Sequence, residues 1–137
     1  FTKGKKQIKY MLQVNRTEKN MKLSKIKEIL DAEVLAGEEL LDSEVDSAFG
    51  SDLMSDVLAF VNDRVLLLTG LVNPQVVGTA EMMDISAIVF VRGKRPDENV
   101  IALAEAKNIV ILSTAHTLYV ASGRLYSEGL TGDEKEV

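Results

Sequence analysis

Three apolar stretches decide the fold: Val65-Leu66-Leu67-Leu68-Thr69, Ala87-Ile88-Val89-Phe90-Val91 and Ile109-Val110-Ile111-Leu112. They carry apolar residues continuously, which is typical of strands that are covered on both faces of a parallel sheet. Each stretch is followed by a short polar segment, at residues 70–74, 92–96 and 113–116. In a parallel sheet such segments meet at one edge, where helix N-termini collect and ligands usually bind. The sequence therefore predicts where a site lies before it predicts what the site does.

Helical patterns lie between these strands and before them. Asn73-Pro74 pairs a capping residue with proline at the first helical position. Pro96 with Asp97 and Glu98 opens the next helix and places acidic side chains at its positive end. Residues 23–30 and 53–61 also place apolar side chains at helical spacing. We expect the remaining caps at Ser24, at Ser51 or Asp52, and at Thr114. Together these elements predict an α/β fold whose mainly parallel sheet has right-handed crossovers and helices on both faces.

The composition of the 137 residues narrows the class of protein. The chain has no cysteine, so neither a disulfide nor a cysteine nucleophile is possible, and we expect a cytoplasmic protein. No apolar run approaches the roughly 20 residues that cross a bilayer, so we expect no membrane partner. Residues 21–137 carry twenty Asp or Glu against ten Lys or Arg. Because nucleic acids need clustered cations, this acidic body argues against a nucleic-acid partner.

We divide the chain into three parts. Residues 1–20 form a basic extension, with six Lys or Arg against one Glu, that we place outside the domain; the alternative is that residues 7–14 pair as a strand. Residues 21–130 form the domain, with a short strand at 33–36 and another within 45–49. Residues 131–137 form an acidic tail. The acidic run over 38–46 is interpreted as a solvated loop, with a divalent-cation site as the alternative.

The predicted site lies at the loop edge of the sheet. Glycine lets the backbone approach a ligand, a helix N-terminus favours an anion, and cations after the second strand can neutralise a phosphate or carboxylate. The eight candidates are Thr69, Gly70, Asn73, Arg92, Gly93, Ser113, Thr114 and His116. A tight turn at Gly70, a solvated cationic loop and a packing role for His116 are the alternatives. We expect no catalytic residue, cofactor or metal.

Over most of its length the chain resembles a DRTGG domain. The resemblance is carried by residues 49–55, by Thr69-Gly70-Leu71-Val72-Asn73-Pro74-Gln75-Val76, by residues 88–96, and by residues 111–114 with 123–126. It implies a fold like the N-terminal domain of HPr kinase and a non-catalytic accessory module. Domains of this family occur beside CBS domains in regulated pyrophosphatases and within long phosphotransacetylases, where they lie at dimer interfaces. The resemblance therefore also implies a dimeric arrangement.

The chain departs from the pattern that gives this family its name. Leu71, Val72 and Asn73 stand where the family has Asp-Arg-Thr, and only Gly93 is kept of Thr-Gly-Gly, where this chain has Val91-Arg92-Gly93. The pair Asp63-Arg64 precedes its strand and is unrelated to the motif. There is no phosphate loop of the kinase type, so kinase activity does not carry over.

These observations predict a regulatory or ligand-sensing domain that binds a small anionic metabolite or nucleotide and acts as a homodimer. Tyr119 and Tyr126, one heptad apart, are expected to share a face that packs on a second subunit. The first alternative is a scaffold for a partner protein, with Leu71 and Val72 offering the apolar surface. The second is an acyl- or phosphoryl-transfer enzyme that uses His116 with a neighbouring hydroxyl.

Overall fold

The computed structural model describes residues 20–62 and 64–132, and its centre is a five-stranded sheet of order β2-β7-β6-β5-β4. Strands β4 to β7 run parallel, and β2 pairs antiparallel with β7 at one edge. The expected α/β fold with a mainly parallel sheet is confirmed. A separate two-stranded ribbon joins β1 to β3.

The strands are short and the helices between them have seven to ten residues. The strands are β1 Met21–Lys22, β2 Glu33–Ala36, β3 Glu44–Val45, β4 Ser47–Gly50, β5 Val65–Thr69, β6 Ala87–Phe90 and β7 Val110–Ser113. The helices are α2 Leu23–Leu30, α3 Met54–Phe60, α4 Pro74–Met82, α5 Glu98–Ala106 and α6 Leu118–Ser127, with a 3₁₀ turn at Glu38–Leu40.

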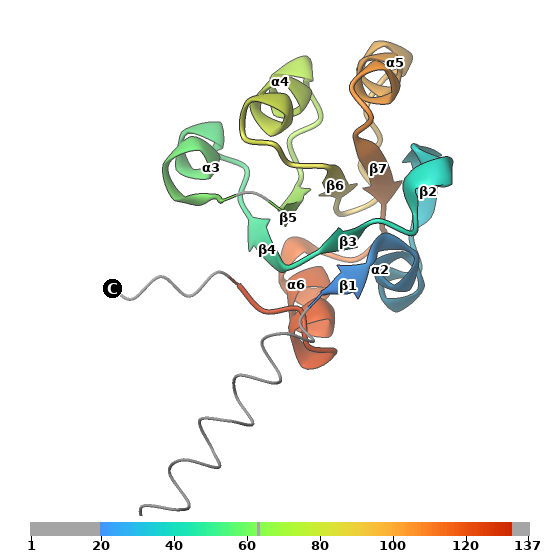
Figure 1. Cartoon of the computed structure of the whole chain (residues 1–137), viewed down its shortest axis with the longest axis vertical. Coiled ribbons are helices and arrows are strands. Elements are labelled where there is room, and N and C mark those ends of the chain that lie inside the picture. Colours follow the sequence, from blue (N-terminus) through green and yellow to red (C-terminus); the bar gives the residue numbers. More distant parts are fainter. Residues whose placement is uncertain (1–19, 63, 133–137) are drawn as a thin grey trace, which may run out of the picture.

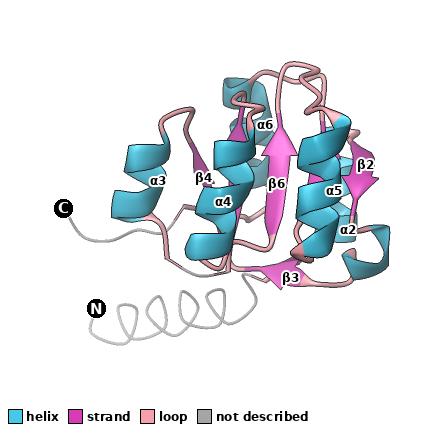
Figure 2. Ribbon diagram, turned by 90° about the horizontal axis from the view of Figure 1, so that it is seen from above, coloured by secondary structure: helices cyan, strands magenta, loops and turns pink. Residues whose placement is uncertain are grey.

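Helices cover both faces of the sheet, as Figure 1 shows. Each step from β4 to β7 moves to the neighbouring strand through one helix, so crossovers of the same hand place α3, α4 and α5 on one face. Helices α2 and α6 cover the other face, and the view in Figure 2 shows α4 and α5 lying along the sheet. Every residue of β5, β6 and β7 is buried, which explains why their sequences are apolar throughout.

Two helix starts agree with the sequence. Asn73 caps α4 by accepting from the N–H of Gln75 at 3.1 Å, with Pro74 at the first helical position. Asp97 caps α5 by accepting from the N–H of Val100 at 3.1 Å. Each cap bonds an amide no more than three residues away, so the local sequence is sufficient to predict it.

The other expected caps are wrong. Helix α2 follows β1 directly from Lys22, and α3 follows Leu53, in each case without a side-chain cap. Thr117 rather than Thr114 caps α6, accepting from the N–H of Val120 at 3.3 Å. His116 therefore lies before the helix instead of in its first turn.

Leu71 and Val72 are half-buried and pack against the core beneath α4, so they do not offer the free apolar surface that the scaffold alternative used. Tyr126, by contrast, is 58% exposed.

The basic extension at 1–20, its alternative strand at 7–14 and the acidic tail lie outside the described residues, except for residues 20, 131 and 132. No helix in the described part of the chain is long and apolar enough to cross a membrane.

Candidate functional site

The three strand-to-helix turns meet at one edge of the sheet, which we call the rim and define by Thr69-Gly70, Arg92-Gly93 and residues 113–116. Thr69 lies beside Phe90, and Phe90 lies beside Ser113, so the parallel register ends the three strands together. Backbone bonds then join one turn to the next: the N–H of Val91 donates to the Thr69 carbonyl at 3.1 Å. The predicted grouping of these residues at one edge is therefore present.

The first turn is held by a carboxylate that comes from outside it. Asp52, just before α3, accepts through Oδ1 from the N–H of Gly70 at 2.7 Å and from the hydroxyl of Thr69 at 3.1 Å. The same Thr69 hydroxyl oxygen accepts from the N–H of Leu71 at 3.1 Å. An acidic side chain of this protein thus already bonds the amide that we expected to hold an anion.

The second turn places Arg92 over the first. Arg92 has a left-handed backbone with φ of 58°, and its N–H donates to the His116 carbonyl at 2.7 Å. Its guanidinium lies against Gly70, because a Cβ built on that glycine would stand 2.7 Å from Arg92 Nη2. Within the described residues no carboxylate forms an ion pair with Arg92. Its exposed charge is therefore available to an anionic ligand.

In the third turn, the hydroxyl groups of Ser113 and Thr114 are used in hydrogen bonds within the protein. Thr114 is 1% exposed, and its hydroxyl donates to the Leu30 carbonyl at 2.7 Å. The same oxygen accepts from the N–H of His116 at 3.3 Å, and the Thr114 carbonyl accepts from Gly93 at 2.8 Å. Ser113 is also buried and donates to the Lys94 carbonyl at 2.9 Å. These two hydroxyls fasten the rim to α2 and to the loop after β6.

The amides of the rim are therefore satisfied inside the chain. The backbone N–H groups of Gly70, Leu71, Arg92, Gly93 and His116 all donate to the protein's own oxygens. These five amides are therefore not free to hold an anion, contrary to the expectation from the glycine and helix-start pattern. What the rim can offer a ligand is side-chain chemistry. Among the eight candidates, the side chains that reach solvent are those of Arg92 and Asn73, which are exposed, and that of His116, which is half-buried.

The cations of the second turn behave differently from one another. Arg95 forms an ion pair with Glu33 of β2. Lys94 is exposed, and its N–H closes a turn onto the Val91 carbonyl at 3.1 Å. Asn73 is used as the cap of α4. Of the cations in this loop, Arg92 is the one that lies over the first turn.

Asp52 is the residue of the rim that the eight candidates omitted. From the sequence, Ser51 or Asp52 was expected to cap the helix that follows. Instead Ser51 accepts from the N–H of Leu53 at 3.0 Å, while Asp52 bonds a turn that is 18 residues away. No local pattern marks such a contact.

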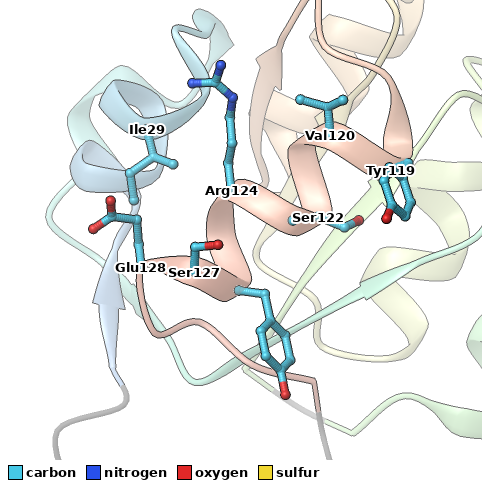
Figure 3. Close-up of a pocket in the computed structure, with 9 residues that line it drawn as sticks. Ile29, Tyr119, Val120, Ser122, Arg124, Ser127 and Glu128 are labelled. Atoms are coloured by element: carbon cyan, nitrogen blue, oxygen red, sulfur yellow. The ribbon is translucent and has the colours of Figure 1, made fainter.

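A second surface, the outer face of α6, carries an open depression of about 650 Å³. Figure 3 shows its lining: Tyr119 and Tyr126 on either side of Ser122, with Arg124, Glu128 and Ile29 of α2 beyond them. Tyr119 is 88% exposed and Tyr126 is 58% exposed, which is unusual for large aromatic side chains. Gly123 also lines the depression, and a Cβ built on it would meet no atom within 4 Å.

Three smaller cavities lie elsewhere, two of them beside β4 and one between the C-terminal ends of α4 and α5. None of these four depressions is lined by any of the eight candidates. Across residues 20–62 and 64–132, no three acidic or histidine side chains gather as a metal site would require. The acidic run over 38–46 therefore gives no such cluster among its described side chains.

Comparisons with known proteins bear on the whole fold. The sequence matches the family model of the DRTGG domain over residues 25–127. In a search of solved structures the chain is similar to the CBS and DRTGG domains of the regulatory region of Clostridium perfringens pyrophosphatase, complexed with the activator diadenosine tetraphosphate. That likeness has a TM-score of 0.62 at 19% identity.

It covers 82% of this chain but 51% of the other, so this chain spans about half the length of that structure. No curated protein matches the sequence. The family match extends from α2 to the end of α6 and so includes the rim and the outer face of α6. The chain belongs to the DRTGG domain family.

Proposed function

We propose that this protein is a non-catalytic regulatory domain that senses a small anionic metabolite or nucleotide at the rim and acts as a homodimer. The observation that carries the proposal is the position of Arg92. Its guanidinium has no ion-pair partner among residues 20–62 and 64–132, and it lies over the first turn of the rim, where three strand-to-helix loops meet. Guanidinium groups bind phosphates and carboxylates through two parallel hydrogen bonds.

The comparisons support a regulatory role for the family. The similar structure is a regulatory region, and that region is complexed with a nucleotide activator. We extend this to the present chain as a proposal, because the rim here keeps Gly93 but replaces most of the motif of the family. In our account the anion is bound by side chains, since the rim amides are already used.

The test is a thermal shift with a panel of nucleotides and acyl phosphates. A ligand that binds only the native state raises the melting temperature as its concentration rises. Arg92→Ala should abolish the shift. Lys107→Ala, which removes an exposed cation at the opposite end of α5, should leave it unchanged. No shift with any panel member at millimolar concentration would remove the sensing function.

We infer that the homodimer forms through the outer face of α6. Tyr119 and Tyr126 are exposed on this helix, and a Cβ built on Gly123 meets no atom within 4 Å. An inverted second copy can therefore place a tyrosine of one chain over the open space at Gly123 of the other. Arg124 and Glu128 add one cation and one anion, which are also complementary when the face is inverted. A twofold interface requires this kind of self-complementarity.

Size-exclusion chromatography with light scattering measures the molar mass of the protein and so tests whether it is a dimer. Tyr119→Ser with Tyr126→Ser should reduce the mass to that of one chain. Met82→Ser, which removes a side chain 72% exposed on α4, should not change the mass. A monomeric wild-type protein, or a dimer that survives the double substitution, would contradict the assignment of this face.

One observation favours the scaffold as a second candidate. Helix α3 and the residue before it expose Leu53, Leu58 and Phe60, which are between 45% and 62% exposed. Exposed apolar groups of this kind often mark a protein contact. Capture of a stable partner that is lost in Phe60→Ser, with no ligand shift at the rim, would favour the scaffold over the sensor.

A further inference from the structure

We propose that Asp52 determines which anions the rim accepts, admitting ligands that carry a hydrogen-bond donor beside the anionic group and disfavouring bare anions. This inference rests on the proposed function and concerns the same rim. The ligand class that fits is a phosphate ester of a hydroxyl-bearing molecule, such as a nucleoside phosphate.

The carboxylate of Asp52 is fixed in the rim. Its Oδ1 accepts from Gly70 at 2.7 Å and from Thr69 at 3.1 Å, two donors that come from the end of β5. Arg92 lies over the same glycine, so the cation and the carboxylate flank one short piece of backbone. They are not paired with each other, since the described residues include no ion pair of Arg92.

This arrangement gives the rim two chemically distinct groups. Asp52 is exposed, and its second oxygen, Oδ2, accepts no hydrogen bond from the described residues. A carboxylate oxygen only accepts, so it can be satisfied by a hydroxyl or amino group of a ligand. Arg92 only donates, so it is satisfied by phosphate or carboxylate oxygens.

A bare anion that has no proton to donate, such as sulfate, satisfies one of these groups and is repelled by the other. It would meet Arg92 favourably but would lie close to a fixed negative charge that it cannot neutralise. A nucleoside phosphate can place its phosphate on Arg92 and a sugar hydroxyl on Asp52. The carboxylate thus converts a general anion site into one that discriminates between anions.

The experiment is isothermal titration of the full chain with sulfate and with adenosine monophosphate. Asp52→Asn keeps an Oδ1 that can accept from both Gly70 and Thr69, so the fold is retained while the charge is removed. We expect sulfate to bind about tenfold more tightly in this variant, equivalent to about 1.4 kcal/mol. Adenosine monophosphate should gain nothing or weaken, so the wild-type preference for the nucleotide falls by roughly tenfold.

The control is Asp84→Asn. Asp84 is exposed at the opposite edge of the sheet with φ of 55°, a conformation that asparagine tolerates, and its substitution should leave both affinities unchanged. If Asp52→Asn changes the affinities for both ligands by the same factor, or changes neither affinity, the selectivity role is wrong although the Arg92 site stands. If the wild type binds neither ligand, both the site and this inference are overturned.

Discussion

Gly70 provides the sharpest way to separate the stability of the rim from its binding of ligands. Replacing it with alanine adds one methyl group, which would stand 2.7 Å from Arg92 Nη2 and 3.5 Å from Arg92 Cζ. The contact at 2.7 Å is too close, so something has to move. The atoms in the way are the far end of a flexible side chain, and Gly70 is not in the left-handed region. Gly70→Ala should therefore displace the guanidinium without straining the backbone.

The substitution should change the free energy of unfolding less than it changes the free energy of anion binding. Replacing an unstrained glycine by alanine stabilises a protein by about 0.4–1 kcal/mol through the unfolded chain, and this offsets the small cost of moving Arg92. The free energy of unfolding should thus stay within about 1 kcal/mol of the wild type. A charge-assisted hydrogen bond contributes about 1.5–3 kcal/mol. Anion affinity should consequently fall by a factor of about ten to a hundred or more.

Urea unfolding and calorimetric titration with adenosine monophosphate measure the two effects on the same sample. Gly78→Ala on α4 is the matched control, because a Cβ built at Gly78 meets no atom within 4 Å. That variant should bind normally and be slightly more stable. The reasoning is refuted if Gly70→Ala binds like the wild type, or if it loses several kcal/mol of stability.

Three other substitutions test the framework. Thr114→Val should cost about 1–3 kcal/mol in urea unfolding, since it leaves the Leu30 carbonyl without its buried donor; a cost below about 0.5 kcal/mol would contradict the role given to this hydroxyl. Gly37→Ala should cost more than about 1–2 kcal/mol, the price of a left-handed residue, because φ is 78° and the new methyl would lie 2.9 Å from Val110 Cγ2; an unchanged melting temperature would refute it. Glu33→Ala should change stability by less than about 1 kcal/mol, because both members of its ion pair are more than half exposed; a larger loss would show that the pair is not a surface contact.

The sequence was sufficient for the parts of the fold that depend on local signals. Continuous apolar runs predicted β5, β6 and β7, because strands buried on both faces leave no polar position. The caps Asn73 and Asp97 were predictable because each bonds an amide two or three residues away. The grouping of the loops at the rim followed from parallel strands alone.

The errors come from contacts between residues that are distant in the chain. Thr114 looked like a cap but donates to Leu30, 84 residues away. Asp52 looked like a cap but bonds Gly70, 18 residues away, and so occupies the amide that the sequence offered to a ligand. Short polar side chains carry the same local signal in either role, and only the packing of α2 and α3 on the sheet decides between them.

The central claim is that the rim, through Arg92, is where an anionic ligand binds. Titration of the ¹⁵N-labelled chain with adenosine monophosphate, followed by amide chemical shifts, tests it most directly. Our account predicts the largest shifts at Gly70, Arg92, Gly93 and His116, with the outer face of α6 unchanged. Shifts confined to α6, or no shifts at millimolar nucleotide, would contradict it.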